Sequence, residues 1–300
     1  MKQEDILKIT IIGLGLIGGS LGLALKAALG EKIAITGADK NEASLAAAKE
    51  RGAIDVIAVS SSEAAACADF VFLGVPMLQM TPVLQKIAPF LKPGAIVSDV
   101  GSTKGYLVEN ALNILPAHVH FVPGHPMAGR EESGIGAANV ALFQGKWYIF
   151  ATYDNLDAEA TQKTAQLIKK TGAKITFMDI ASHDAYTALI SHVPHVAAAA
   201  MVNLLAFSED ADKSLKLAGG GFRDTTRIAS SNADMWADIL LTNKDAIITG
   251  LEKFQNILDN VIMAAKENDR AELYNFFAAA KTRRDALLEM EAMNIGSKSE

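Results

Sequence analysis

Residues 8–18 read KITIIGLGLIG, a short apolar run that leads directly into a glycine-rich turn. The run Ile9–Ile12 is typical of a buried strand, and a helical stretch from Ser20 to Ala28 follows the glycines. In this setting Gly13 and Gly15 allow a tight turn and a close backbone approach to a pyrophosphate, and Gly18 lets the helix pack on the strand. The helix N-terminus would face the phosphates, so we predict a dinucleotide-binding turn.

The choice of dinucleotide follows from Asp39, which ends the next predicted strand about 20 residues beyond the turn. A carboxylate at this place accepts hydrogen bonds from ribose hydroxyls and repels a 2′-phosphate, so we predict NAD rather than NADP. The predicted cofactor contacts are Gly13, Gly15, Leu16, Ile17, Gly18, Asp39, Val75 and Ser102.

Strand-like runs alternate with helical stretches from Lys8 to about Asp179, as is typical of a parallel or mixed sheet covered by helices. The runs are residues 8–13, 33–38, 70–75, 95–100, 120–123, 147–152 and 174–178. Beyond about Ala181 helical periodicity takes over. We predict an α/β chain with a Rossmann-type doubly wound sheet in residues 1–180, a short junction, and an all-α C-terminal dimerisation domain in residues 181–300.

One predicted helix carries an unusually wide apolar face. Its seam steps by four and three through Ile247, Leu251, Phe254, Leu258, Val261 and Ala265, and Ile248, Ile257 and Ile262 widen it. A face this wide is buried on both flanks, so we expect core packing together with a homodimer interface. A core helix that serves only its own chain is the alternative.

Composition limits the other function classes. The 300 residues are 50% hydrophobic with a formal net charge of −6 and no Lys/Arg run, which argues against a nucleic-acid partner. The single cysteine, Cys67, allows no intramolecular disulfide, fits a cytoplasmic protein and is expected to be a small core residue. The N-terminus has no secretory apolar region, and the longest apolar run, Val196–Phe207, is too short to span a bilayer, so we expect no membrane partner.

Two polar clusters follow predicted strands. Ser102, in the stretch GSTKG, comes after a strand that ends at Val100, and His125 lies in GHPMAG, a turn bounded by glycines and held by Pro126. Both would reach the edge of the sheet where a nicotinamide lies, and a neutral imidazole can take an alcohol proton while hydride departs. We predict His125 and Ser102 as catalytic residues; a helix cap for Ser102 and a structural hydrogen bond for His125 are the alternatives.

The stretch SHVPH, Ser191 to His195, lies in the first helix of the second domain, with His183-Asp184 before it. Histidines raise the question of a metal, but no Cys ligand or Glu-x-x-His pattern accompanies them, so we predict no metal. Either His192 or His195 would face the cleft and hold a polar substrate group, while the other is satisfied inside the helix pair.

A glycine turn at residues 219–221 leads into a cationic helix. Arg223 and Arg227 are four residues apart and would share a helix face. An arginine fork suits a carboxylate, whereas a solvated face is the alternative. Trp236 is large enough to close a pocket or an interface.

Five motifs in order, GLGLIGGS, DVGSTK, GHPMAGREESG, SHVPH and GGFRDTTRIA, resemble the prephenate/arogenate dehydrogenase family of tyrosine biosynthesis. The resemblance extends from Lys8 to the C-terminal helices. It implies NAD-dependent oxidative decarboxylation of prephenate to 4-hydroxyphenylpyruvate in a dimer with interlocking helical domains. It makes His125 the catalytic histidine, Ser102 its neighbour and Arg227 the group that binds a substrate carboxylate. The residues it places around the substrate pocket are Glu131, Ser191, His192, His195, Asp224 and Trp236.

Other functions stay open at this point. Arogenate dehydrogenase performs the same chemistry on an amino-bearing substrate; Glu131 would favour its ammonium, whereas His195 could donate to the keto oxygen of prephenate, which we expect to be the better substrate. A β-hydroxyacid dehydrogenase would need a lysine in its helical domain, and none occurs between Ala181 and Asp212. A non-catalytic NAD(H)-sensing protein would not need Ser102, His125 and Arg227 together.

Overall fold

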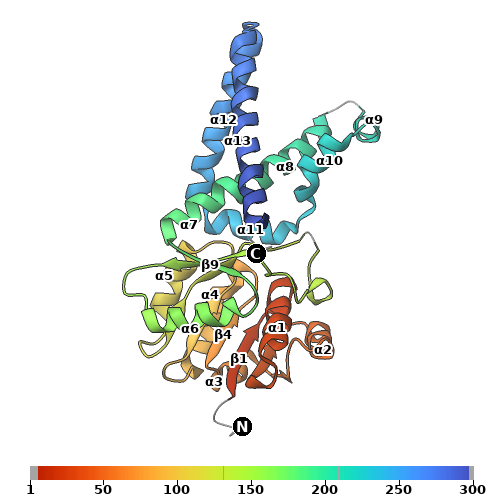
Figure 1. Cartoon of the computed structure of the whole chain (residues 1–300). Coiled ribbons are helices and arrows are strands. Elements are labelled where there is room, and N and C mark those ends of the chain that lie inside the picture. Colours follow the sequence, from red (N-terminus) through yellow and green to blue (C-terminus); the bar gives the residue numbers. More distant parts are fainter. Residues whose placement is uncertain (1–5, 131, 208–209, 297–300) are drawn as a thin grey trace. The chain divides into compact units, whose positions relative to one another are not determined.

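The computed structural model describes residues 6–130, 132–207 and 210–296 (Figure 1). The chain divides into two compact units, Met1–Ile247 and Ile248–Glu300, and each is described by itself.

The first unit is built on a six-stranded parallel sheet in the order β3-β2-β1-β4-β5-β6. The strands are β1 (Leu7–Ile12), β2 (Ile33–Ala38), β3 (Val56–Ile57), β4 (Phe70–Leu73), β5 (Ile96–Asp99) and β6 (His120–Val122). The strand order reverses between β1 and β4, which is the point where doubly wound sheets bind ligands beyond their carboxyl ends. The predicted Rossmann-type sheet is confirmed, with the two-residue β3 as a strand that the sequence did not reveal.

Helices cover both faces of this sheet, because successive strand residues point to opposite sides. On β1, Ile11 belongs to the core under α1 (Leu16–Leu29), α2 (Glu42–Glu50) and α6 (Ala158–Lys169). Ile12 belongs to the core under α3 (Ser61–Ala66), α4 (Met77–Ile87) and α5 (Gly105–Ile114). Short 3-10 turns η2 (Gly30–Lys32), η3 (Ala88–Phe90) and η4 (Ile135–Ala137) complete this part.

Three further strands form a second sheet, which is separate from the hydrogen-bonded ladder of the first. The sequence predicted a single sheet. The strands of the second sheet are β7 (Gly124–Pro126), β8 (Trp147–Thr152) and β9 (Lys174–Asp179), with β7 antiparallel and β9 parallel to β8. The chain leaves the main sheet after β6 at Pro123, which has no N–H to give to a ladder. His125 therefore lies on a strand, opposite Ile149 of β8, and not in the turn that the sequence suggested.

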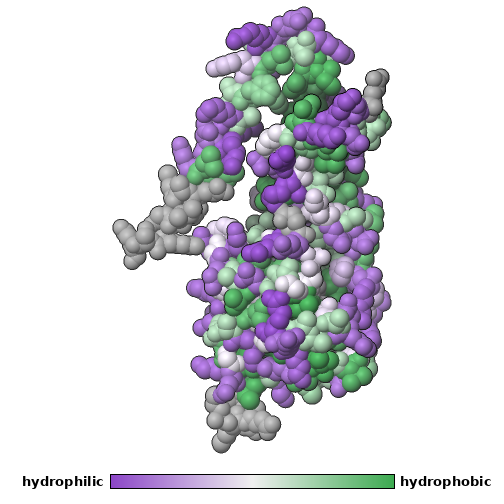
Figure 2. All heavy atoms as spheres, turned by 90° about the vertical axis from the view of Figure 1, so that its right-hand side faces the viewer, coloured by the Kyte–Doolittle hydropathy of each residue, from purple (hydrophilic) through white to green (hydrophobic). Residues whose placement is uncertain are grey.

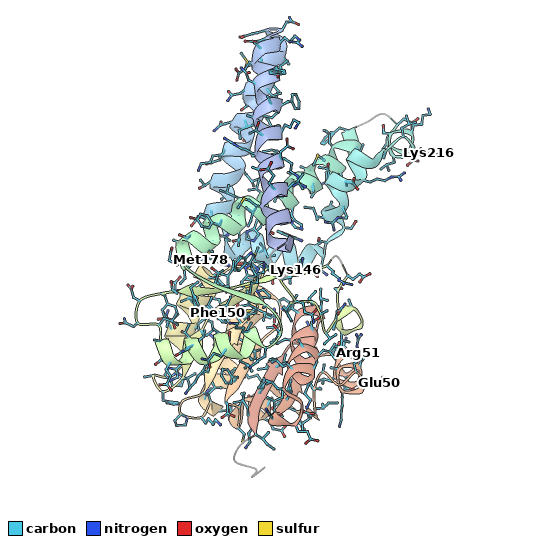
Figure 3. All side chains as sticks on the ribbon, viewed as in Figure 1. Glu50, Arg51, Lys146, Phe150, Met178 and Lys216 are labelled. Atoms are coloured by element: carbon cyan, nitrogen blue, oxygen red, sulfur yellow. The ribbon has the colours of Figure 1, made fainter. Side chains whose placement is uncertain are left out.

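The segment after β7 is tied to the nucleotide-binding layer by Arg51 and by Ser20 of α1, whose Oγ accepts from the Asn139 amide at 2.9 Å. The guanidinium of Arg51, labelled in Figure 3, donates to the backbone carbonyls of Ile135, Gly136 and Ala138 at distances of 2.6–2.8 Å. Three bonds from one rigid fork hold η4 against α1 and α2.

The helical part of the first unit starts without a linker, since β9 ends at Asp179 and this residue caps α7 through the Ser182 amide at 2.8 Å. Its elements are α7 (Ile180–Thr187), the π-helical η5 (Ala188–His192), α8 (Val193–Leu204), η6 (Leu205–Phe207), α9 (Ala211–Lys216), α10 (Gly220–Thr226), η7 (Arg227–Ser230) and α11 (Ala233–Thr242). The first compact unit ends at Ile247 and so includes both the sheets and these helices. The predicted domain boundary between residues 180 and 181 stays a prediction.

Two long helices complete the chain, α12 (Lys244–Lys266) and α13 (Arg270–Gly296). The predicted seam lies on α12, where Ile247 is buried but Ile248, Ile257, Leu258 and Ile262 are each 45–50% exposed. Figure 2 shows hydrophobic side chains at the surface of helical segments toward the top of the view. A single chain thus leaves much of this apolar face uncovered, which fits a further protein surface.

Two expectations need correction. Cys67 is exposed at the C-cap of α3 and is not a core residue. The helical stretch Ile180–Phe207 is continuous over 28 residues and, by length and composition alone, could cross a membrane, whereas the apolar run read from the sequence was shorter. This stretch carries His183, His192 and His195, which a bilayer would penalise. The expectation of no membrane partner stays a prediction.

Candidate active site

The glycine turn after β1 has no room for other side chains at two positions. Gly13 has φ +96°, and a Cβ there would lie 2.5 Å from the Val75 nitrogen. A Cβ on Gly18 would lie 2.0 Å from the Gly13 carbonyl oxygen, so this glycine lets α1 pack against the turn. Val75 therefore borders the turn, as predicted for a cofactor contact.

Gly15 differs, because a Cβ there would meet no atom within 4 Å. It is the N-cap of α1, and neither a side-chain cap nor an acidic residue occupies the first turn, which contains Leu16 and Ile17. Unpaired amides at a helix N-terminus beside open space form a place for an anion. These residues fit the pyrophosphate of a dinucleotide.

Asp39 fastens the turn to the end of β2. Its Oδ2 atom accepts from the Leu14 amide at 2.7 Å and its Oδ1 atom from the Asn41 amide at 2.9 Å. Each carboxylate oxygen can accept a second hydrogen bond, so the group keeps capacity for ribose hydroxyls. Asp39 thus has a structural role that the sequence did not reveal, in addition to its place beside the predicted adenosine site.

Ser102 lies half-buried beyond the end of β5, at the same edge of the sheet as the glycine turn. It does not cap α5. The amides of Lys104 and Gly105 instead donate to Asp184, at 2.9 and 2.8 Å. The alternative of a helix cap for Ser102 is therefore wrong.

His125 is 8% exposed, and its Nδ1 atom lies 2.8 Å from Nε2 of His183 on α7. Burial, followed by the positive charges that His183, Lys104 and His192 can carry, lowers the pKa of His125 well below its usual value. The imidazole is thus neutral at pH 7, which is the state that a general base needs.

The chain of contacts continues from His183 to Asp184, whose Oδ1 atom lies 2.7 Å from His183 Nδ1. Burial of Asp184 opposes its ionisation, but the bonds from His183 and from the α5 amides outweigh burial and lower its pKa. The sequence placed His183-Asp184 only near a possible metal. The position of His183 and Asp184 just after a predicted strand could have marked them as site residues. Their pairing with His125 joins two elements that are distant in sequence, so local patterns did not reveal it.

A buried ion pair holds the residue before His125. Lys104 Nζ contacts Asp99 Oδ2 and donates to the Gly124 carbonyl at 2.6 Å, while the Gly124 amide donates to Asp99 Oδ1 at 3.2 Å. Both side chains are 0% exposed. Burial lowers the pKa of Lys104, and Asp99 opposes that shift. Sequence reasoning missed this pair, although Asp99 and Lys104 flank the GST turn.

His192 and His195 have different surroundings. His192 is buried, and its Nδ1 atom lies 3.3 Å from the side-chain Nδ2 atom of Asn243, while burial lowers the pKa of His192 to about 4. His195 is half-buried, donates from Nδ1 to the Ser191 carbonyl at 2.9 Å, and stacks on Trp236 with ring centroids 3.7 Å apart. His192 is thus the histidine satisfied within the protein, and His195 is the better placed of the two to meet a ligand.

The π-helical η5 explains why these residues group together. Ser191 and His192 lie in it, and Pro194 follows at the start of α8, where its missing N–H interrupts the regular α-helical ladder. A π-helical turn inserts an extra residue and rotates the side chains that follow, a device frequent at functional sites.

The remaining predicted substrate residues are less closely defined. Arg227 is exposed at the start of η7, which packs against α8. Arg223 lies in the last turn of α10, and Arg227 follows directly with αR backbone at the start of η7, so a shared face for the two arginines stays a prediction. Asp224 is exposed on α10. Glu131 lies outside the described residues.

Comparisons with known proteins give two family matches: the nucleotide-binding domain of prephenate dehydrogenase over residues 21–177 and its dimerization domain over residues 179–279. The chain belongs to the prephenate dehydrogenase family. It is 38% identical to the prephenate dehydrogenase of Bacillus subtilis over 93% of this chain and 76% of that protein.

Two solved structures extend the similarity. Prephenate dehydrogenase from A. aeolicus, in complex with hydroxyphenyl propionate and NAD+, has a TM-score of 0.89 at 32% identity, covering 95% of this chain and 100% of that one. Synechocystis arogenate dehydrogenase has a TM-score of 0.80 at 30% identity, covering 94% and 100%. The resemblance predicted from the motifs is confirmed.

Within the described ranges no group of three or more His, Cys, Asp or Glu side chains is arranged to hold a metal ion. His125 and His183 instead bond to each other. That this prephenate dehydrogenase family member works without metal stays a prediction.

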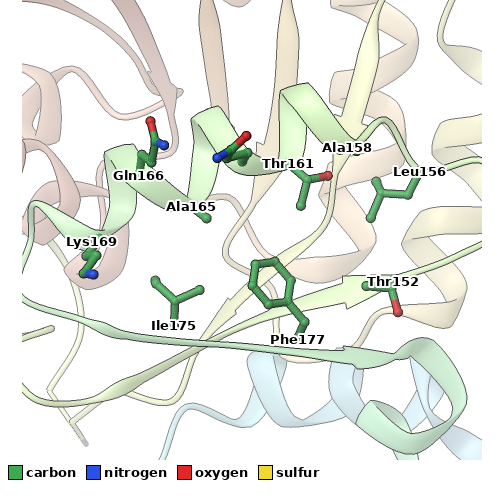
Figure 4. A pocket seen from close by; sticks show the side chains of 10 residues that line it. Thr152, Leu156, Ala158, Thr161, Ala165, Gln166, Lys169, Ile175 and Phe177 are labelled. Atoms are coloured by element: carbon green, nitrogen blue, oxygen red, sulfur yellow. The ribbon is translucent and has the colours of Figure 1, made fainter.

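A groove of about 530 Å³ lies elsewhere, between α6 and the strands β8 and β9 (Figure 4). Its lining is mainly apolar, with Ala165, Ile175 and Phe177 facing the hollow. It contains none of the residues assigned above to cofactor or substrate, and an active site at the edge of the main sheet stays a prediction.

Proposed function

We propose that this protein is an NAD-dependent prephenate dehydrogenase, which converts prephenate to 4-hydroxyphenylpyruvate and carbon dioxide in tyrosine biosynthesis. The observation that carries the proposal is a buried His125, bonded to His183 near the carboxyl ends of the parallel strands, in a chain whose two parts match the two domains of that family. The homologue that binds NAD+ together with a hydroxyphenyl compound supports the pairing of cofactor and substrate.

In this reaction NAD+, when bound, accepts hydride from the ring carbon that carries the hydroxyl. The amides at the N-terminus of α1 hold its pyrophosphate, and Asp39 holds its adenosine ribose. His125 takes the hydroxyl proton at Nε2, with Ser102 beside the same oxygen. Loss of the opposite carboxylate as carbon dioxide then sends an electron pair through the ring to that oxygen, which recovers the proton from His125. The electrons and the proton balance, and formation of the aromatic ring favours products.

Arg227 binds a substrate carboxylate, with Ser191, His195 and Trp236 around the side chain of the substrate. A guanidinium suits this task because its planar fork matches a carboxylate. His192, bonded to Asn243, contacts the Trp236 ring edge-on and so supports the ring on which His195 stacks.

One observation favours arogenate as a second substrate. Because the Ser191 carbonyl can only accept, His195 carries its proton on Nδ1, and burial lowers its pKa, so a neutral His195 presents a lone pair at Nε2. A lone pair accepts from the ammonium of arogenate but cannot donate to the keto oxygen of prephenate, contrary to the donor role expected from the sequence.

The dimerisation domain is part of the family match. We propose that the uncovered apolar face of α12 lies in a homodimer, that the protein is cytoplasmic and that it uses neither nucleic acid nor a membrane as a partner.

The test measures reduced-cofactor formation with prephenate and with arogenate, each against NAD and NADP. We expect turnover of prephenate with NAD. Absence of turnover with both substrates and both cofactors would refute the proposal, and turnover of arogenate alone would make it an arogenate dehydrogenase.

A further inference from the structure

The function of His125 depends on which of its ring nitrogens carries the proton. We propose that His183 and Asp184 are positioning residues that keep this proton on Nδ1, so that Nε2 is the atom that receives the substrate proton. The inference rests on the proposed function and assigns its base one reactive atom.

Asp184 is the fixed end of this series of hydrogen bonds, because the backbone of α5 holds its carboxylate. Its Oδ1 and Oδ2 atoms accept from the backbone amides of Lys104 and Gly105, which can only donate, at 2.9 and 2.8 Å. An ionised carboxylate is acceptor-only, so the contact of 2.7 Å to His183 Nδ1 requires a proton on that nitrogen.

The proton on His183 Nδ1 in turn determines which nitrogen of His125 carries a proton. A neutral His183 with its proton on Nδ1 has a lone pair on Nε2, which accepts from His125 Nδ1 across 2.8 Å. A neutral His125 with its proton on Nδ1 has its own lone pair on Nε2. Two imidazoles and one carboxylate thus leave the base with a single free basic atom.

The same chain supports the charged state of the base. After His125 takes the proton it donates from both nitrogens, and the bond from Nδ1 to His183 is kept without rearrangement. The Asp184 carboxylate, one imidazole away, offsets the cost of a buried positive charge. The proton stays on His125 until the product oxygen recovers it.

Protonation of His183 would reverse the order. A charged His183 donates from both nitrogens, so His125 would have to accept at Nδ1 and carry its proton on Nε2, where it could not act as a base. The other ionisable groups near His125 are Lys104, Asp99 and His192.

Variants at position 183 separate this role from simple packing. His183→Leu removes the acceptor and should lower kcat by about 10² to 10⁴ with a smaller change in KM. His183→Gln places an amide oxygen near the former Nε2, where it can accept from His125 Nδ1, and should restore at least about tenfold of that loss. His118→Asn, which changes an exposed histidine bonded to the Leu91 carbonyl, is the control and should keep wild-type kcat.

A second measurement does not depend on how the variants at position 183 fold. In the wild-type protein labelled with ¹⁵N-histidine, the His125 signals, assigned with His125→Asn, should show a protonated Nδ1 and an unprotonated Nε2. A proton on Nε2 at neutral pH would overturn the inference, as would His183→Leu with wild-type kcat and an unchanged pH profile.

The outcomes also separate this inference from the proposed function. A wild-type protein that turns over neither prephenate nor arogenate defeats the proposed function, while the nitrogen signals still report the tautomer. Full activity of a wild-type protein whose His125 carries its proton on Nε2 would refute the positioning role of His183 and Asp184 and leave the proposed function intact.

Discussion

The Nδ1 atom of His125 lies 2.8 Å from the Nε2 atom of His183, although 58 positions separate the two residues in sequence. This contact joins β7, which follows the nucleotide-binding sheet, to α7, which begins the helical part. The proposed base is therefore held where substrate bound by helices could meet a nicotinamide bound at the sheet edge.

Replacement of His125 by Ala should lower kcat by about 10² to 10⁴, the range for loss of a positioned general base, with a smaller change in KM for prephenate. Steady-state rates of cofactor reduction provide the measurement. His120→Ala, which removes a histidine paired with Asp157 at 3.4 Å, is the control and should leave kcat near wild type. Near-normal turnover by His125→Ala would show that the proton goes elsewhere.

The pH dependence of kcat/KM should show base activity well into the acid range. A lowered pKa keeps His125 deprotonated below about 6.5, the usual value, so kcat/KM should fall only at lower pH. Stability should follow the same direction: folding disfavours protons on His125 and on His192, whose pKa is about 4, so the free energy of unfolding should decrease as pH falls below about 6.5. Rate profiles and urea unfolding at several pH values test both. An acid limb centred above 6.5 would contradict the assignment.

Cofactor choice should depend on Asp39. Asp39→Ser removes the charge that repels a 2′-phosphate, so the ratio of kcat/KM for NAD over NADP should decrease. Asp69→Ser is a matched control, because Asp69 also accepts a backbone amide, from Lys8 at 2.7 Å, but at the start of β1 and far from the carboxyl edge. It should leave the ratio unchanged. Equal efficiency with both cofactors in the wild type would refute the role of Asp39.

Arg227 should govern binding more than chemistry. Arg227→Ala should raise KM for prephenate strongly while kcat falls less, at a cost of about 2 to 5 kcal/mol if the carboxylate pair is shielded from water. Arg223→Ala, in the last turn of α10, is the control and should matter less. An unchanged KM in Arg227→Ala would show that another group binds the carboxylate.

Loss of the buried ion pair should affect both stability and rate. Lys104→Met leaves Asp99 buried without its cation, which costs about 3 to 5 kcal/mol, and removes the donor to the Gly124 carbonyl that helps to place His125. Lys92→Met breaks the partly exposed pair with Asp69 and should cost about 1 kcal/mol or less. Urea unfolding compares the two. Equal stability of Lys104→Met and the wild type would mean that Lys104 does not compensate the Asp99 charge.

The sequence alone predicted the parts of this protein that depend on neighbours along the chain. An apolar strand, a glycine turn and a helix follow one another at Ile9–Ala28, and Asp39 ends the next strand, so local patterns were enough for the Rossmann-type sheet and its nucleotide edge. The polar clusters at Ser102 and His125 also follow strands. Because parallel strands end at one edge, sequence order was enough to place them near that edge.

Tertiary structure alone decided how the proposed base is held and how the surroundings of His192 and His195 differ. His183 reaches His125, Asp184 caps α5, and the Lys104–Asp99 pair holds Gly124, all through contacts between elements distant in sequence. The difference between His192 and His195 arises from a π-helical turn and from Asn243, which caps α11 and lies 51 positions beyond His192 in sequence. Hydrogen bonds are directional and act over about 3 Å, so their partners are set by packing, which local sequence patterns do not encode.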